Sequence, residues 1–251
     1  MRKPKISLII PAHNEERRIG RTLNRFFKIF SDQFRDDFEI IIIINNCNDR
    51  TLNVVQDFCR SSSNLRFKNF NSSIGKGGAI IEGFKLAKGE YVSFVDADGS
   101  TGPFDFLRVM RGIGGNDGAI GSRWLTDSKK INHPFSRKII SRGFNILVRV
   151  LFRFPYRDTQ CGAKIFRKES IDCLLSDLGI SGFSFDVELL YLLHKKGFKI
   201  IEIPIRWKHY GKSSLDMRKA IPLMFLSVVR LRIMESRLRY VLGPLMNMFM
   251  R

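Results

Sequence analysis

The 251-residue sequence contains no uninterrupted apolar run of the length that a membrane-spanning helix requires, about 18 to 20 residues. Its nearest candidates, 221–229 and 242–250, are about half that length. The apolar run after the basic start ends at Pro11, which is too short for the hydrophobic region of a secretory signal. We therefore expect a first buried strand there, and a protein that lies on a membrane, if it meets one, without spanning it.

Cysteine pairs and acidic residues are also scarce. The four cysteines form no Cys-x-x-Cys pair and no histidine spacing that suits zinc, so a disulfide framework or a zinc site is not indicated and a reducing setting is expected. Against 24 Asp and Glu stand 43 Lys and Arg, for a net charge of +19. This excess predicts a polyanionic partner, and charge alone leaves open nucleic acid, an anionic membrane surface or a phosphorylated substrate.

Apolar runs rich in β-branched residues alternate with helical patterns. The runs lie at 6–10, 39–44 and 91–95, and the helical patterns at 16–30, 50–60 and 76–88. This alternation predicts βαβ units and an α/β fold, with a mainly parallel sheet covered by helices on both faces. Ligands of such sheets gather at the carboxyl ends of the strands, which here carry PAHNEE, NNCNDRT and DADGST. Further strands are expected at 119–124 and 200–207, and further helices at 136–154, 168–177 and 183–197.

The predicted helix at 136–154 and the tail from about residue 217 combine basic with apolar residues. Arg142, Arg149 and Arg153 recur along the helix beside an apolar stripe, and the tail alternates apolar blocks with arginines. Such helices suit an anionic lipid surface. We therefore expect an α/β domain at 1–215 and a basic amphipathic tail at 216–251 that lies on the membrane.

Asp96 and Asp98 come directly after the third apolar run, so both carboxylates leave the sheet edge together. Two carboxylates and a diphosphate commonly hold Mg²⁺ or Mn²⁺, which would act as a Lewis acid on a departing nucleotide diphosphate. An isolated Asp-x-Asp is also common in solvated turns. The preceding strand and the following Gly99 favour the metal site.

Two other segments could bind a nucleotide or an anion. In PAHNEE, Asn14 can cap the next helix, and Glu15 can accept hydrogen bonds from a base or ribose at the end of the first strand. The segment 75–78 brings glycine backbone and Lys76 to a helix start, which suits an anion but suits a flexible loop equally well.

Arginines and a late acidic pair are further candidates. Arg123 ends a predicted strand and Arg137 opens the basic helix, and both can bind phosphate bidentately, although any one arginine in so basic a chain is more often a solvated surface charge. Asp186 and Glu188 are two positions apart on a helix, so only one can face a cleft. For Asp186, partly buried, a structural salt bridge is as plausible as catalysis.

Taken in order, the motifs resemble those of the polyprenyl-phosphate sugar synthases of glycosyltransferase family 2. They are PAHNEE, IGKGGAI, DADGST, GSR, DTQCGAKIF, FDVELL and GKSS. The resemblance covers about residue 5 to 235 and is strongest to the dolichyl-phosphate β-glucosyltransferases, with the mannose synthases less similar. It implies a GT-A fold with C-terminal amphipathic helices, and a metal-dependent hexosyltransferase that acts with inversion.

The resemblance also implies substrates, a location and residue roles. The donor would be a nucleotide diphosphate sugar, with UDP-glucose favoured, and the acceptor a polyprenyl or dolichyl phosphate. The enzyme would lie peripherally on the cytoplasmic face of the cell membrane, or of the endoplasmic reticulum in a eukaryote, and serve protein glycosylation. The implied donor site comprises Pro11, His13, Glu15, Asn46, Lys76, Asp96, Asp98 and Lys212; Asp96 and Asp98 are the catalytic metal ligands, and Arg123 and Arg137 bind the acceptor phosphate.

Two departures from the family pattern bear on the donor. An acidic pair followed by Gly-Ser usually stands where this chain has Asn45 to Asn48, so base recognition can differ. The mannose synthases place a glutamine where Ser100 stands, which favours the glucosyltransferases. Alternatives are a GDP-mannose or UDP-GlcNAc donor, a non-lipid acceptor, a nucleotidyltransferase, and a nucleic-acid-binding protein; the last has no RNP, zinc or helix-turn-helix signature to support it, so nucleic acid is not expected as a partner.

Overall fold

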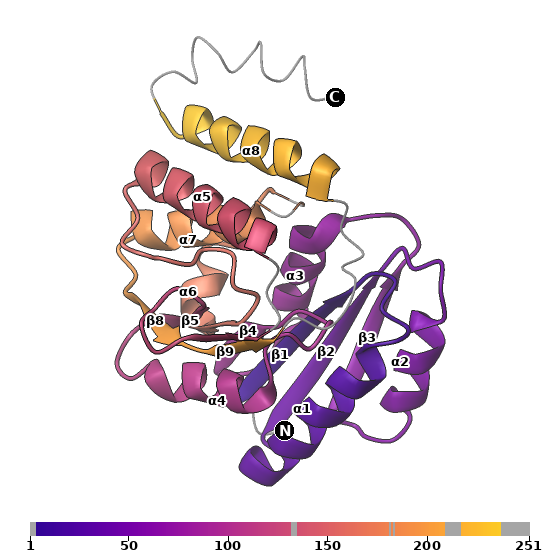
Figure 1. Ribbon diagram of the computed structural model, residues 1–251. Helices are drawn as coiled ribbons and strands as arrows, with labels where there is room; N and C mark the ends of the chain where they lie inside the picture. The colour runs from indigo at the N-terminus through magenta and orange to yellow at the C-terminus, as the bar shows by residue number, and fades with distance from the viewer. Residues whose placement is uncertain (1–3, 132–134, 181, 183, 209–216, 237–251) are drawn as a thin grey trace.

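The computed structural model describes residues 4–131, 135–180, 182, 184–208 and 217–236 (Figure 1). The strands are β1 (Ile6–Ala12), β2 (Phe38–Asn45), β3 (Leu65–Phe70), β4 (Tyr91–Phe94), β5 (Gly118–Ser122), β6 (Lys129–Ile131), β7 (Lys164–Arg167), β8 (Ile200–Pro204) and β9 (Arg206–Lys208). The helices are α1 (Ile19–Phe34), α2 (Thr51–Cys59), α3 (Gly75–Leu86), α4 (Pro103–Gly112), α5 (Phe135–Phe152), α6 (Lys168–Asp172), α7 (Phe185–Lys195) and α8 (Met217–Met234).

In the described part of the chain, seven strands form one sheet in the order β3-β2-β1-β4-β7-β5-β8. Neighbours pair in parallel throughout, except that β7 runs antiparallel to both β4 and β5. A second, two-stranded sheet joins β6 to β9. The prediction of an α/β fold with a mainly parallel sheet is therefore confirmed.

Alternate residues of the central strands face two separate hydrophobic clusters. On β1, Leu8 and Ile10 pack with α1, α2 and α4 on one face, whereas Ile9 packs with α3 and α7 on the other. All of them are fully buried. Strands buried on both faces appear as continuous apolar runs, which is why the sequence pattern located β1 and β2.

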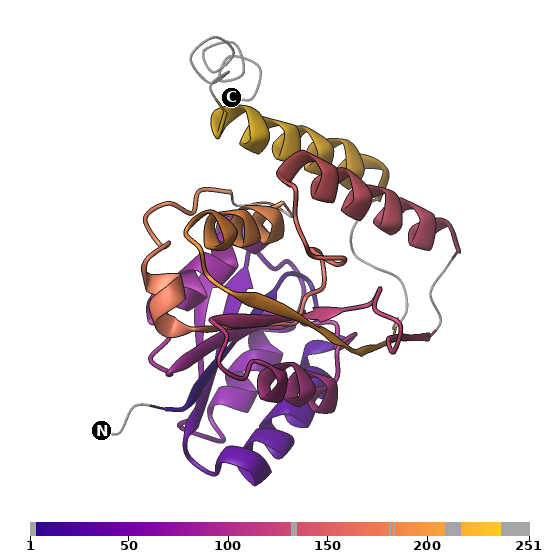
Figure 2. The ribbon, with the colours of Figure 1, turned by 90° about the vertical axis from the view of Figure 1, so that its left-hand side faces the viewer.

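Helices α5 and α8 lie side by side as the outer layer on the α3 and α7 side of the sheet (Figures 1 and 2). Val148 of α5 and the α8 residues Val228 and Leu231 are buried in the same cluster as α7. Large apolar side chains nevertheless remain exposed on these two helices: Ile146, Val150, Leu223, Phe225 and Leu226.

Several local expectations differ from the structure. Helix α1 begins at Ile19 rather than near residue 16, and no side chain caps its first turn. Asn14 was expected to be that cap, but its Oδ1 accepts the backbone N–H of Asn48 at 2.8 Å and so links the ends of β1 and β2. Strands β3, β6 and β7 and helix α4 were not predicted.

Candidate active site

The carboxyl ends of β1, β2, β4 and β5 lie at one edge of the sheet, because these strands are mutually parallel or are related through the antiparallel β7. The four segments predicted to carry chemistry follow these ends. Residue 13 follows β1, Asn46 follows β2, Asp96 follows β4 and Arg123 follows β5. The topology thus places most of the predicted site residues at a single edge.

The two aspartates of DADGST lie close enough to influence each other's protonation. Burial raises the pKa of Asp98, and the Asp96 carboxylate raises it further. Burial also acts to raise the pKa of Asp96, but the nearby cations, Lys76 foremost and then Lys164 and Arg123, hold that pKa below its usual value. Asp98 is oriented by the backbone N–H of Ser100, which donates to its Oδ1 at 2.8 Å.

Lys76 joins the aspartate pair to a buried ion pair beneath it. Its Nζ lies 2.9 Å from Asp96 Oδ1 and 3.4 Å from Asp186 Oδ2. Asp186 also pairs with Lys164, and both of these side chains are almost completely buried. Although burial acts to lower the pKa of Lys76, Asp186 and Asp96 raise it above its usual value, so this lysine stays charged.

The acidic pair on α7 has divided roles, as its helical spacing predicted. Asp186 faces the two lysines, whereas the carboxylate of Glu188 accepts backbone N–H groups of Gly179 and Ile180 at 3.2 and 2.9 Å. Asp186 is thus the member near the site, and it makes a salt bridge there, one of the two roles left open. The segment 75–78 forms the first turn of α3.

Glu15 pairs with Arg18 next to the aspartates. Arg18 donates from Nε and Nη2 to the Glu15 carboxylate at 2.6 and 2.7 Å, and the Glu15 backbone N–H donates to Thr51 Oγ1 at 2.8 Å. Burial raises the pKa of Glu15 to about 7 even though Arg18 acts to lower it. Arg18 also favours the anionic form of Asp98, so it adds positive charge near the aspartate pair.

The remaining donor-site candidates line the ends of β1 and β2. Pro11 lies within β1, and the His13 ring nitrogen Nδ1 is 2.7 Å from the Asn45 carbonyl oxygen. Asn46 has a positive φ of 49°, a conformation that asparagine tolerates better than most residues, and its N–H donates to the Phe70 carbonyl. The first contact ties the end of β1 to β2, and the second ties the end of β2 to β3. Lys212 lies outside the described residues.

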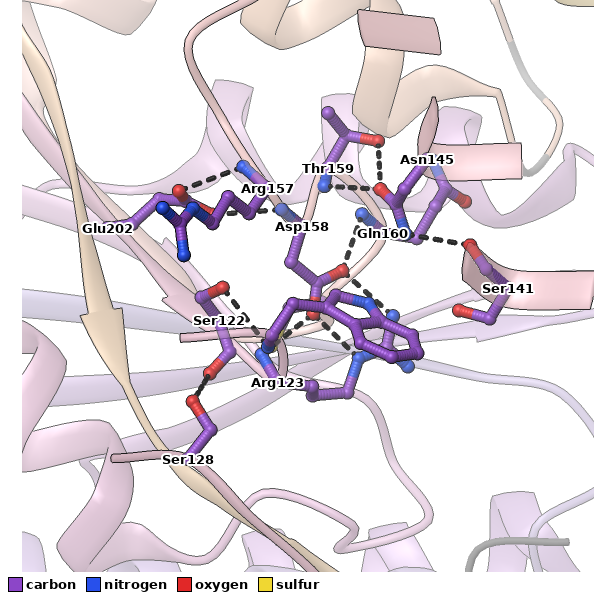
Figure 3. A network of polar contacts seen from close by, with 12 residues as sticks. Ser122, Arg123, Ser128, Ser141, Asn145, Arg157, Asp158, Thr159, Gln160 and Glu202 are labelled. Carbon is purple, nitrogen blue, oxygen red and sulfur yellow. Dashed lines mark hydrogen bonds and ion pairs between the residues drawn. The ribbon is translucent and has the colours of Figure 1, made fainter. Parts of the chain in front are cut away.

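Arg123 is held by a buried carboxylate that the sequence did not single out. Asp158, fully buried, accepts the Arg123 backbone N–H at 2.9 Å, Nε–H at 2.8 Å and an Nη2 hydrogen at 2.9 Å (Figure 3). Although burial acts to raise the pKa of Asp158, Arg123 keeps it below its usual value. Arg123 also lies over the Trp207 ring, 5.6 Å from its centroid.

The second predicted acceptor arginine, Arg137, belongs to α5, but its side chain lies outside what the structure describes. Asp158, Lys164 and Arg18 were not among the residues predicted to form the site. The motif DTQCGAKIF contains the first two, and the sequence signal available for them was charged residues among apolar and small ones. Arg18 gave no signal apart from its distance of three residues from Glu15.

The aspartate pair suits a divalent cation that a diphosphate helps to hold. In the described residues no group of three or more His, Cys, Asp and Glu side chains is arranged to hold a metal ion alone. Mg²⁺ is usually held by one or two carboxylates together with substrate phosphates, so a two-carboxylate site fits it. Burial and the neighbouring Asp96 carboxylate raise the pKa of Asp98, so a bound cation would favour its charged form.

Comparison with known proteins identifies the family of this chain. The family model described as "Glycosyl transferase family 2" matches residues 7–175, which is more than half of the chain. The chain therefore belongs to glycosyl transferase family 2, a family of sugar-transferring enzymes.

Within that family, similarity is high to one group of relatives. A dolichyl-phosphate β-glucosyltransferase of Dictyostelium discoideum is 36% identical over 95% of this chain and 75% of its own length. The human protein of the same name is 29% identical over 95% of this chain and 76% of its own. Glucosyl-3-phosphoglycerate synthase of Mycobacterium tuberculosis, solved with Mn²⁺, UDP and phosphoglyceric acid, aligns with a TM-score of 0.68 at 15% identity, over 92% of this chain and 78% of its own, and supports the expected GT-A fold.

Proposed function

We propose that this protein transfers glucose, with inversion, from UDP-glucose to a dolichyl or other polyprenyl phosphate at a membrane surface. The observation that carries the proposal is that two strand-end carboxylates, Asp96 and Asp98, and a largely buried arginine, Arg123, lie at the same sheet edge. Relatives named dolichyl-phosphate β-glucosyltransferase, at up to 36% identity over most of the chain, support the lipid acceptor and the sugar.

The donor would lie across the ends of β1, β2 and β4. Glu15, His13 and Asn46 surround the place for the nucleoside, and Asp96, Asp98 and Lys76 surround the place for the diphosphate. A bound Mg²⁺ or Mn²⁺ would be held by Asp96 and Asp98 and would act as a Lewis acid on the diphosphate. Lys76, kept charged by Asp186, would place a further positive charge against the leaving group.

The acceptor would approach from the Arg123 side. A phosphate monoester carries about −1.5 to −2 charge near pH 7, so it is a nucleophile that needs no strong general base. Its oxygen would form a bond to the anomeric carbon while the bond from that carbon to the diphosphate breaks, and the nucleoside diphosphate would leave. Arg123 and Arg137 would offset the repulsion between acceptor phosphate and donor diphosphate.

Membrane association would be peripheral and would use the outer layer of α5 and α8. Among the described helices we find none that combines the length and apolar character needed to cross a bilayer. Ile146 and Val150 of α5 are 52% and 72% exposed, and Leu223 of α8 is 60% exposed. Arg142 and Arg149 are also exposed on α5. Apolar groups beside cationic ones suit an anionic lipid surface. Of the predicted tail 216–251, α8 belongs to this surface, and residues 237–251 lie outside the described part of the chain.

A partition assay tests the proposal. The purified full chain is incubated with Mg²⁺, dolichyl phosphate in vesicles, and UDP-glucose, UDP-GlcNAc or GDP-mannose carrying a labelled sugar. We expect label in the chloroform phase with UDP-glucose, and an Asp98→Ala variant as the background control. Label from another donor alone would revise the sugar, and no labelled lipid with any donor would end the lipid-acceptor proposal.

A further inference from the structure

The loop 157–160, which supplies the carboxylate that holds Arg123, is fastened from two sides. From the sheet, the Glu202 carboxylate of β8 accepts the backbone N–H groups of Arg157 and Asp158, both at 2.8 Å. From α5, the Asn145 side-chain oxygen accepts the Thr159 backbone N–H at 2.9 Å and its hydroxyl at 3.0 Å (Figure 3). The loop therefore has one attachment to the rigid sheet and one to the outer helix layer.

Asn145 is itself fixed. Its side chain is 3% exposed, and its Nδ2 donates to the carbonyl oxygen of Ser141 one helical turn earlier at 3.0 Å. A buried amide with both its oxygen and its nitrogen engaged has little rotational freedom, and its loss would leave the Thr159 N–H buried without an acceptor. The position of the loop thus depends on where α5 lies.

Asp158 transmits that position to Arg123. The carboxylate takes the Nε hydrogen and one Nη2 hydrogen of the guanidinium, so three of the five N–H donors remain for a ligand. Guanidinium and carboxylate meet in a planar, bidentate arrangement. A shift of the carboxylate therefore changes the direction in which the remaining N–H donors point. The direction of those donors is therefore set, through Thr159, by Asn145.

We propose that Asn145 is a positioning residue that places the phosphate-binding donors of Arg123 at a fixed offset from α5. The inference rests on the proposed function, since the phosphate is that of the lipid acceptor. Ile146 and Val150, the exposed apolar residues of α5, follow Asn145 on the same helix. The phosphate of a membrane lipid lies at a fixed depth in the membrane surface. An arginine whose position is fixed relative to the helix that lies on that surface is therefore already at the right depth to bind the phosphate.

The test compares Asn145→Ala with Asn145→Asp, which retains an oxygen acceptor for Thr159. With dolichyl phosphate in vesicles, we expect the KM for the lipid to rise about tenfold in the alanine variant, with kcat and the KM for UDP-glucose within about twofold of wild type. The aspartate variant should recover part of the lipid KM, because it keeps the acceptor for Thr159 but loses the Nδ2 donor to Ser141. Vesicle flotation should be unchanged in both variants, because no exposed apolar residue is altered.

The matched control is Asn64→Ala before β3, where the amide donates to the carbonyls of Phe38 and Asp36 at 2.8 and 3.3 Å, far along the sheet from Arg123. It should lower the melting temperature without changing the lipid KM. The inference is overturned if Asn145→Ala leaves the lipid KM unchanged and lowers kcat only in proportion to the loss of folded protein. Asn145 would then have a structural role alone. Wild-type protein that forms no labelled lipid would count against the proposed function instead.

Discussion

Gly162 lies against the carboxylate of Asp96, so replacing it with alanine should disable the candidate metal site through a single added carbon. A Cβ built at this position would lie 1.9 Å from Asp96 Oδ2 and 2.3 Å from its Cγ, whereas ordinary contact begins at 3.4 Å. The Asp96 carboxylate must therefore move by about 1.5 Å, the difference between 1.9 Å and the 3.4 Å of ordinary contact.

Such a movement would change the contacts of the Asp96 carboxylate. Asp96 Oδ1 now lies 2.9 Å from Lys76 Nζ, so a displacement of this size can break that contact and misdirect the carboxylate. Misplacement of a reacting group by about 1 Å can cost about 10²-fold in rate, and overpacking costs about 1–3 kcal/mol of stability. Lys76 would remain charged because Asp186 still neighbours it.

The assay measures kcat for sugar transfer as a function of Mg²⁺ and Mn²⁺ concentration, together with thermal unfolding. For Gly162→Ala we expect kcat to fall about 10²-fold and half-saturation to require more metal. Gly115→Ala is the matched control, because nothing lies within 4 Å of its added Cβ. A Gly162→Ala protein with wild-type turnover and metal dependence would refute the reasoning, since Asp96 would then tolerate displacement.

Three further predictions concern other parts of the molecule. Asp98→Ala should lower turnover by about 10²-fold or more while the melting temperature is retained, because burial and Asp96 already disfavour the charged carboxylate; retained activity would remove its assignment as a metal ligand. The pKa of Glu15 is about 7 in the fold against 4.5 unfolded, so its contribution to stability is present below pH 4.5 and is lost as pH rises through 7. Unfolding curves should accordingly show wild type losing stability relative to Glu15→Gln between pH 5 and 8, and parallel pH profiles would contradict this. Val150→Glu or Leu223→Glu should weaken flotation with anionic vesicles at unchanged melting temperature, whereas undiminished flotation would locate the membrane surface elsewhere.

The amino-acid sequence alone predicted the central strands β1, β2 and β4 and the sheet edge that carries the candidate site. Strands β1 and β2 are buried on both faces, so they appear in the sequence as continuous apolar runs, which are typical of buried parallel strands. Parallel strands bring their carboxyl ends together, so the sequence predicts that Asp96 and Glu15 lie at the same edge. The sequence was less informative for β3, whose burial alternates, and for β7, whose four residues begin with the buried Lys164.

Only the tertiary structure decided which charges pair. Asp158 meets Arg123 across 35 residues, and Lys76 meets Asp186 across 110, because the antiparallel β7 and helix α7 bring late segments back to the early sheet edge. Local periodicity contains no information about such separations, since the pairing depends on strand order and on the burial of each partner. The same reason explains why Asn145 showed no functional signal in the sequence: its role exists only where α5 contacts the loop 157–160.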